Sequence, residues 1–219
     1  MRPRFAPRVV LSAALLVGAP GCAVIGLAGA VAENVRREGS TRFPADYTGL
    51  EGKSFAVIVS ADRIIEADHA GITARLTDLI DRDLHANAGA SAHIPPARLL
   101  SYLYSNPQWQ ALPRGELGET LGVERLIVVE VVDYRLNEPG NRYTWAGVAS
   151  GVVQVFEIDA GLPDDPAYEK SIVVGFPDRE GLLEEELPRA AVTSELSRRF
   201  AQRVGWLFYG HEERNDITY

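Results

Sequence analysis

The sequence predicts an α/β (α+β) fold in which a single mixed sheet of about five strands is packed by helices. Three observations predict it: the first half alternates β-branched apolar runs with segments of helical period, the second half changes to strand, turn and strand, and a long amphipathic helix closes the chain. The expected order of elements is β-α-β-α-α-β-β-β-α. We find no internal repeat and no second domain in the sequence.

The first strand and the first helix form a βα unit. Residues 55–60 (FAVIVS) are an apolar, β-branched run, which is typical of a strand buried on both faces. Residues 71–87 then switch to helical spacing. The apolar residues that follow this spacing are Ile72, Leu76, Leu79, Ile80 and Leu84.

The middle of the chain predicts a short strand, two short helices and the strongest strand of the sequence. Residues 91–94 are the short strand, and a proline pair then opens a helix that runs through residue 104. Pro113 starts the next helix, which stops at Gly122. Residues 126–132 (LIVVEVV) are the strongest strand, so we expect crossover helices to cover one or both faces of a parallel sheet.

The second half predicts an antiparallel meander and the closing helix. Residues 146–159 and 169–176 are strands bounded by polar turns. Residues 188–209 form the long helix, with Gly210 at its stop position. The apolar residues that share one face of the first of these strands are Val148, Val152, Phe156 and Ile158.

The charge of the chain excludes a general nucleic-acid binder. It has 30 acidic and 22 basic residues, a net charge of -8, and its arginines are scattered. Three of them, Arg2, Arg4 and Arg8, precede the first apolar run, so the rest of the chain is more acidic still. Because phosphate binding depends on clustered cations, we expect no nucleic-acid partner.

The N-terminus has the layout of a signal peptide. Arginines precede the apolar run 9–18, and small residues come directly before Cys22. This layout resembles a bacterial lipoprotein signal, in which the cysteine is lipidated on sulfur, acylated on its amine and left as the new N-terminus. Cys22 is the only cysteine of the chain, which excludes an intramolecular disulfide framework and a cysteine-based zinc site.

Two alternatives stay open for the N-terminal segment. Residues 9–32 are almost continuously apolar, and about 20 such residues suffice for an uncleaved membrane anchor. Cleavage after Ala30 or Ala32 would instead release a secreted protein. Because Ala23 follows the cysteine, the resemblance to sorted lipoproteins favours a lipid anchor on the periplasmic face of the outer membrane.

The predicted organisation therefore has three parts. Residues 1–21 are the lipoprotein signal peptide, residues 22–45 are the lipid-attachment site and a polar tether, and residues 46–219 are the single α/β domain.

The loop after the first strand is the candidate site for chemistry. It brings Asp62, Glu66, Asp68 and His69 to the end of a strand where α/β sheets bind ligands, and such side chains could hold a divalent metal. The simpler interpretation is that Asp68 caps the following helix and that the others are solvated. No glycine-rich phosphate loop, GxSxG or HExxH motif occurs. We therefore predict no catalytic residue, cofactor or metal, and favour a protein that is not an enzyme.

Two groups of aromatic residues could belong to an interface, a ligand pocket or the core. One group surrounds Asn106-Pro107 and the other lies near the end of the closing helix. Their members are Tyr102, Tyr104 and Trp109, and Trp206, Phe208 and Tyr209.

Several segments resemble a group of bacterial envelope lipoproteins. LEGKSFAVIVSA, IPPARLLSY, LGETLGVERLIVVEV and VVQVFEID are similar to the cores of domains related to the N-terminal domain of TolB, the curli secretion lipoprotein CsgG and the activator LpoB. SNPQW, ALPRGELGETLG and EPG resemble an uncharacterised lipoprotein family. The resemblance implies a role in protein-protein interaction during envelope assembly or secretion. Because the long hairpins of CsgG have no counterpart here, we expect no pore.

We therefore expect a lipid-anchored envelope lipoprotein that acts as a non-catalytic binding or assembly module for a protein partner in the periplasm or outer membrane. Two alternatives stay open. One is a metal-assisted hydrolase that uses the acidic loop, and the other is an oligomeric secretion component. The expected partners are the membrane, through the lipid at Cys22, and an envelope protein, and self-association stays open.

Overall fold

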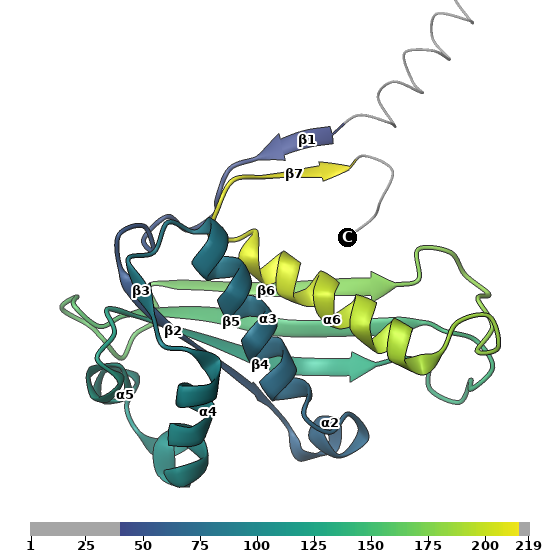
Figure 1. Cartoon of the computed structure of the whole chain (residues 1–219), viewed down its shortest axis with the longest axis horizontal. Coiled ribbons are helices and arrows are strands. Elements are labelled where there is room, and N and C mark those ends of the chain that lie inside the picture. Colours follow the sequence, from purple (N-terminus) through teal and green to yellow (C-terminus); the bar gives the residue numbers. More distant parts are fainter. Residues whose placement is uncertain (1–39, 215–219) are drawn as a thin grey trace, which may run out of the picture. The chain divides into compact units, whose positions relative to one another are not determined.

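The computed structural model describes residues 40–214, which belong to one compact unit (Figure 1). The predicted signal peptide, the lipidation site at Cys22 and most of the tether lie outside the described residues. Within the described part, no helix is both long and apolar enough to cross a bilayer.

A single five-stranded mixed sheet forms the centre of the domain, with strand order β3-β2-β4-β5-β6. β2 runs parallel to β3 and to β4, whereas β4, β5 and β6 are antiparallel neighbours. The predicted fold class is confirmed. The strands are β2 (Ser54–Ala61), β3 (Ala92–His93), β4 (Arg125–Arg135), β5 (Gly147–Glu157) and β6 (Tyr168–Phe176).

The helices follow the predicted order, with two short additions. α2 and the 3-10 helix η1 were not expected, because six and five residues are too short for a helical period to show. The helices are α2 (Arg63–Asp68), α3 (Ile72–Asn87), α4 (Pro96–Ser105), η1 (Pro107–Ala111), α5 (Arg114–Leu121) and α6 (Arg189–Gly205).

The closing helix is shorter than predicted. α6 ends at Gly205, and the expectation that it continues to residue 209 is wrong. Trp206, Leu207 and Phe208 are all buried, and consecutive helical residues point in different directions. The turn that replaces the last helical turn allows all three side chains to enter the core.

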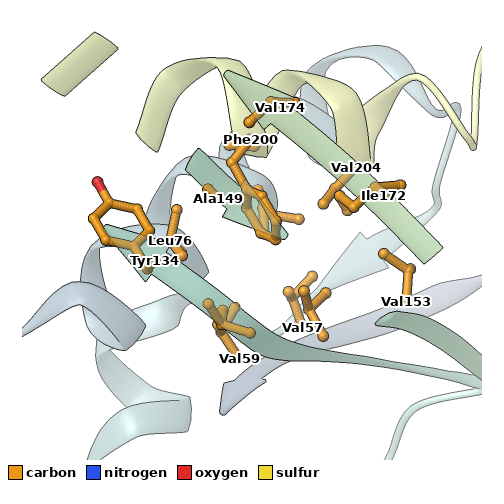
Figure 2. Close-up of a cluster of buried hydrophobic side chains, with 14 of the residues drawn as sticks. Val57, Val59, Leu76, Tyr134, Ala149, Val153, Ile172, Val174, Phe200 and Val204 are labelled. Atoms are coloured by element: carbon orange, nitrogen blue, oxygen red, sulfur yellow. The ribbon is translucent and has the colours of Figure 1, made fainter. Parts of the chain in front are cut away.

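Helices cover both faces of the sheet and define two hydrophobic clusters. α3 and α6 lie side by side on one face (Figure 1), and α4 and α5 pack on the other. Alternate residues of β2 enter the two clusters, which explains its continuous apolar run. Figure 2 shows the cluster under α3 and α6. Its labelled members are Val57, Val59, Leu76, Tyr134, Ala149, Val153, Ile172, Val174, Phe200 and Val204.

Both faces of β5 contain buried residues: Phe156 of the predicted apolar set is 4% exposed in the second cluster, but most of the buried side chains lie on the opposite face. Ala149, Val153 and Val155 are fully buried under α3 and α6, whereas Val148 and Val152 are half-buried on the other face. A Cβ at Gly151 would lie 3.0 Å from Cζ of Phe200 and 2.6 Å from the backbone oxygen of Glu130, so glycine allows α6 to lie close to the sheet.

A two-stranded ribbon lies outside the main sheet. β1 (Ser40–Phe43) pairs antiparallel with β7 (His211–Arg214), so that Ser40 is opposite Arg214. Sequence patterning did not indicate this ribbon, because both strands are short and polar.

Candidate functional site

The strand order creates a topological switch point at β2. The chain passes from β2 to β3 through α3 on one face of the sheet, then returns through α4 and α5 on the other face to β4, on the opposite side of β2. Successive connections therefore diverge at the carboxyl end of β2. In open α/β sheets, ligands bind in the crevice at such a point.

A cleft of about 530 Å³ lies at this position, and we call it the switch-point cleft. Its floor is the carboxyl end of β2, and its walls come from α2 and the start of α3 on one side and from α4 and η1 on the other. This volume lies within the range of small-ligand and side-chain pockets, about 300–1,000 Å³.

The polar wall of the cleft contains two of the four candidate residues. Asp62 is the N-cap of α2, and its Oδ1 accepts hydrogen bonds from the amides of Ile64 (2.8 Å) and Ile65 (2.9 Å). Oε1 of Glu66 accepts from the amide of Gly71 at 2.8 Å. Its other oxygen, Oε2, is buried and has no hydrogen-bond partner among the described residues. Asp62 and Glu66 therefore organise the loop through backbone hydrogen bonds, and Oε2 of Glu66 is the carboxylate oxygen that these bonds do not use.

The prediction that Asp68 caps the following helix is wrong. α3 begins after Gly71, which has φ +79°, and no side chain caps its N-terminus. The loop instead contains the extra helix α2, with Asp62 at its start and Asp68 as its last residue. Gly71 provides the left-handed conformation that separates the two helices, which a residue with a Cβ rarely adopts.

The apolar wall of the cleft contains two members of the aromatic group around Asn106-Pro107, Tyr104 and Trp109, whereas the third, Tyr102, is half-buried against the second cluster. Leu103 is buried, Trp109 is half-buried against the second cluster, and Tyr104 is 91% exposed. Tyr104 is therefore not a core residue, and its ring is accessible beside the cleft. The second aromatic group is different, because Trp206 and Phe208 are core residues and the Tyr209 hydroxyl donates to Oδ2 of Asp83.

The other two candidates, Asp68 and His69, line a separate, smaller pocket together with Arg75 and Arg189. The ring of His69 meets the ring of Tyr134 edge-on at 4.8 Å, and burial, with a contribution from the charge of Arg189, lowers the pKa of the His69 imidazole. The structure thus divides the four candidates into two pairs. Within residues 40–214, no group of three or more His, Cys, Asp or Glu side chains is placed to hold a metal ion.

Sequence reasoning missed a cluster around one buried carboxylate between α3 and β3. Nδ1 of His93 lies 2.9 Å from both carboxylate oxygens of Asp81, and the His85 ring stacks on His93 at 4.0 Å. Asp81 is 1% exposed, and burial raises the pKa of its carboxyl. The only available signal was a carboxylate on the apolar face of a predicted helix. The cluster lies outside the cleft and fixes the edge strand β3 to α3.

No family model matches the sequence, and no curated protein matches it. Some solved structures are similar, each at a TM-score below 0.5. A chain of the PelC dodecamer from Paraburkholderia phytofirmans is 11% identical, with a TM-score of 0.46, over 78% of this chain and 97% of its own. Lipoprotein GNA1162 from Neisseria meningitidis is 11% identical, with a TM-score of 0.45, over 69% and 97%. Protein XCC0632 from Xanthomonas campestris is 11% identical, with a TM-score of 0.44, over 76% and 87%. The similar structures thus include a bacterial lipoprotein, at a level that assigns no residue role or activity to this chain.

Proposed function

We propose that this protein is a lipid-anchored, non-catalytic binding module of the bacterial envelope and that the switch-point cleft receives a segment of a protein partner. The observation that carries the proposal is the cleft itself, with Tyr104 exposed on one wall and carboxylates engaged in backbone hydrogen bonds on the other. Exposed aromatic side chains beside an apolar pocket are the usual anchors of protein interfaces. Side chains that cap and brace a loop are poorly placed for acid-base chemistry.

The anchor part of the proposal rests on the sequence. Cys22 follows an apolar run and small residues, and its lipidation would hold the domain at the periplasmic face of the outer membrane. The resemblance to TolB, CsgG and LpoB domains, which rests on sequence segments, implies the same class of protein-protein role.

Site-specific crosslinking in living cells tests the binding part. A photoreactive amino acid at position 104 should give a discrete adduct with an envelope protein, because Tyr104 projects beside the cleft. The matched control is position 143, since Tyr143 is also a tyrosine and is 81% exposed, in the loop between β4 and β5. Adducts of equal yield at both positions, or at neither, would contradict the cleft as the docking site.

Fractionation tests the anchor part separately. Cys22→Ala should abolish lipidation and move the protein out of the detergent phase. If that variant stays in the detergent phase, the lipid anchor is wrong and an uncleaved membrane anchor over residues 9–32 replaces it. The size of the solubilised wild-type complex distinguishes a single module from an oligomeric secretion component.

A further inference from the structure

The switch-point cleft combines three features that select for a cation. The first is Glu66, whose buried Oε2 has no hydrogen-bond partner among the described residues. An ionised carboxylate only accepts hydrogen bonds, so any group that satisfies this oxygen must be a donor. Buried polar atoms in folded proteins are nearly always paired, and this exception belongs to a residue that lines an open cleft.

The second feature is the pair of aromatic rings on the opposite wall. The face of a tyrosine or tryptophan ring attracts a cation within about 6 Å, most strongly where water is excluded. Tyr104 and Trp109 both line the cleft, and neither is enclosed in the core. Leu100 and Leu103 of α4, in the same wall, provide an apolar surface for the aliphatic part of a long side chain.

The third feature is the charge balance. Asp62 and Glu66 face a single cation among the lining residues, Arg63, which is exposed at the first position of α2. The whole chain carries a net charge of -8, so its field also favours a positively charged partner. An acidic ligand would meet two carboxylates and the field of the protein.

We infer that the switch-point cleft binds an arginine or lysine side chain presented by an apolar segment of the partner protein. The stem of that side chain packs along Leu100 and Leu103, its cationic head lies between the ring of Trp109 and the carboxylate of Glu66, and the flanking apolar residues contact Tyr104. This inference rests on the proposed function, because it states which feature of a partner the cleft recognises.

The inference is tested by measuring the binding of three tripeptides, which differ only in the central residue, to the full chain in detergent micelles. They are acetyl-Leu-Arg-Leu-amide, its citrulline counterpart, which is isosteric but neutral, and its glutamate counterpart. Binding is followed by tryptophan fluorescence, since Trp145 and Trp206 are 4% and 6% exposed and Trp109 is the accessible reporter. Trp109→Phe confirms the assignment of the signal.

We expect the arginine peptide to bind about fivefold more tightly than the citrulline peptide, and the glutamate peptide to bind most weakly. Glu66→Gln should remove the preference for arginine, because it keeps an oxygen for the Gly71 amide and loses the charge. Glu119→Gln, at an exposed position of α5, is the matched control and should change nothing. Arg63→Ala should tighten arginine binding by removing the competing cation.

Equal binding of the arginine and citrulline peptides, an unchanged preference in Glu66→Gln, or no binding of any peptide would overturn the inference. If Glu66→Gln fails to fold, the comparison of the arginine and citrulline peptides on the wild type still decides the inference, and Tyr104→Ala, at a side chain that is 91% exposed, should weaken the binding of both peptides equally. Crosslinking at position 104 does not depend on the charge of the ligand. A crosslinked adduct at position 104, together with equal binding of the arginine and citrulline peptides, would therefore contradict the inference but support the proposed function.

Discussion

The two halves of the sheet are covered differently. Around β2 and the first part of β4, helices pack on both faces, and the strands contribute alternate residues to two clusters. Around β6 and most of β5, α6 covers one face of the sheet. On the other face, Val173 of β6 and Val132 of β4 are each 60% exposed. The doubly covered half holds the crossover connections and therefore the cleft. The singly covered half depends on one helix, which makes it the more vulnerable part of the domain.

The largest expected effect comes from shortening a buried side chain of α6, the helix that covers the singly covered half of the sheet. Phe200 is fully buried and packs over Gly151, so Phe200→Ala should cost about 4 kcal/mol of unfolding free energy, measured by urea denaturation. Amide hydrogen exchange should then accelerate in β5 and β6 and remain slow in β2. Acceleration of equal size in β2 would show that the two halves unfold as one unit.

The ion pairs that α6 forms through Arg198 and Arg199 should make the stability of the domain sensitive to acid. The Arg199 guanidinium is 8% exposed in its side chain and pairs with both oxygens of Asp178 (2.6 and 2.7 Å) and with Oε1 of Glu195 (2.9 Å). Hydrogen bonds from Arg198, and then from Arg199, lower the pKa of Glu195 from 4.5 to about 2. Because the folded-state pKa is depressed, this stabilisation is complete above about pH 4.5 and is lost as the pH falls toward 2.

The corresponding measurement is the unfolding free energy between pH 6 and pH 2 for the wild type and for Glu195→Gln. The acid-dependent loss should be smaller in the variant by roughly 1–2 kcal/mol, after allowance for solvent screening. Glu185→Gln, at an exposed position before α6, is the control and should keep the wild-type profile. Parallel profiles for wild type and Glu195→Gln would assign the acid sensitivity to other groups.

The smallest expected effect comes from the uncovered face. Val173→Lys should change the unfolding free energy by no more than about 0.5 kcal/mol, because this side chain is in water. The adjacent Ile172 is 5% exposed under α6, and Ile172→Lys should cost at least about 3 kcal/mol. A loss above about 1 kcal/mol in Val173→Lys would contradict the prediction that this side chain contributes little to stability.

The sequence predicted the elements better than it predicted their spatial relations. Continuous apolar runs and helical spacing identified β2, α3, β4 and α6, because each of these elements is long enough for its period to show. The sequence pattern favoured Asp68 as a helix cap, whereas Asp62 caps the six-residue α2, which is too short for a helical period to show. Element boundaries also shifted where burial overrode periodicity, as at Trp206.

The candidate site depended on information that a single sequence does not contain. Asp62 and Glu66 were selected because they follow a strand, but the opposite wall comes from Tyr104 and Trp109, about forty residues later in the chain. Their meeting depends on which side of β2 receives β4, and no local pattern encodes that choice. The contact of Asp81 with His93 has the same origin, since it requires the pairing of β3 with β2.

The ribbon of β1 and β7 determines how the domain responds to mechanical load. Ser40 and Arg214 are opposite each other at one end of the ribbon, and Phe43 and His211 close the other end beside the body of the domain. Tension applied through the chain that precedes Ser40 therefore runs along β1 to Phe43 and reaches the body of the domain there, while β7, which is not pulled at Arg214, stays paired with β1. The four residue pairs would separate one after another only under tension between Ser40 and Arg214, the two chain positions at the far end of the ribbon.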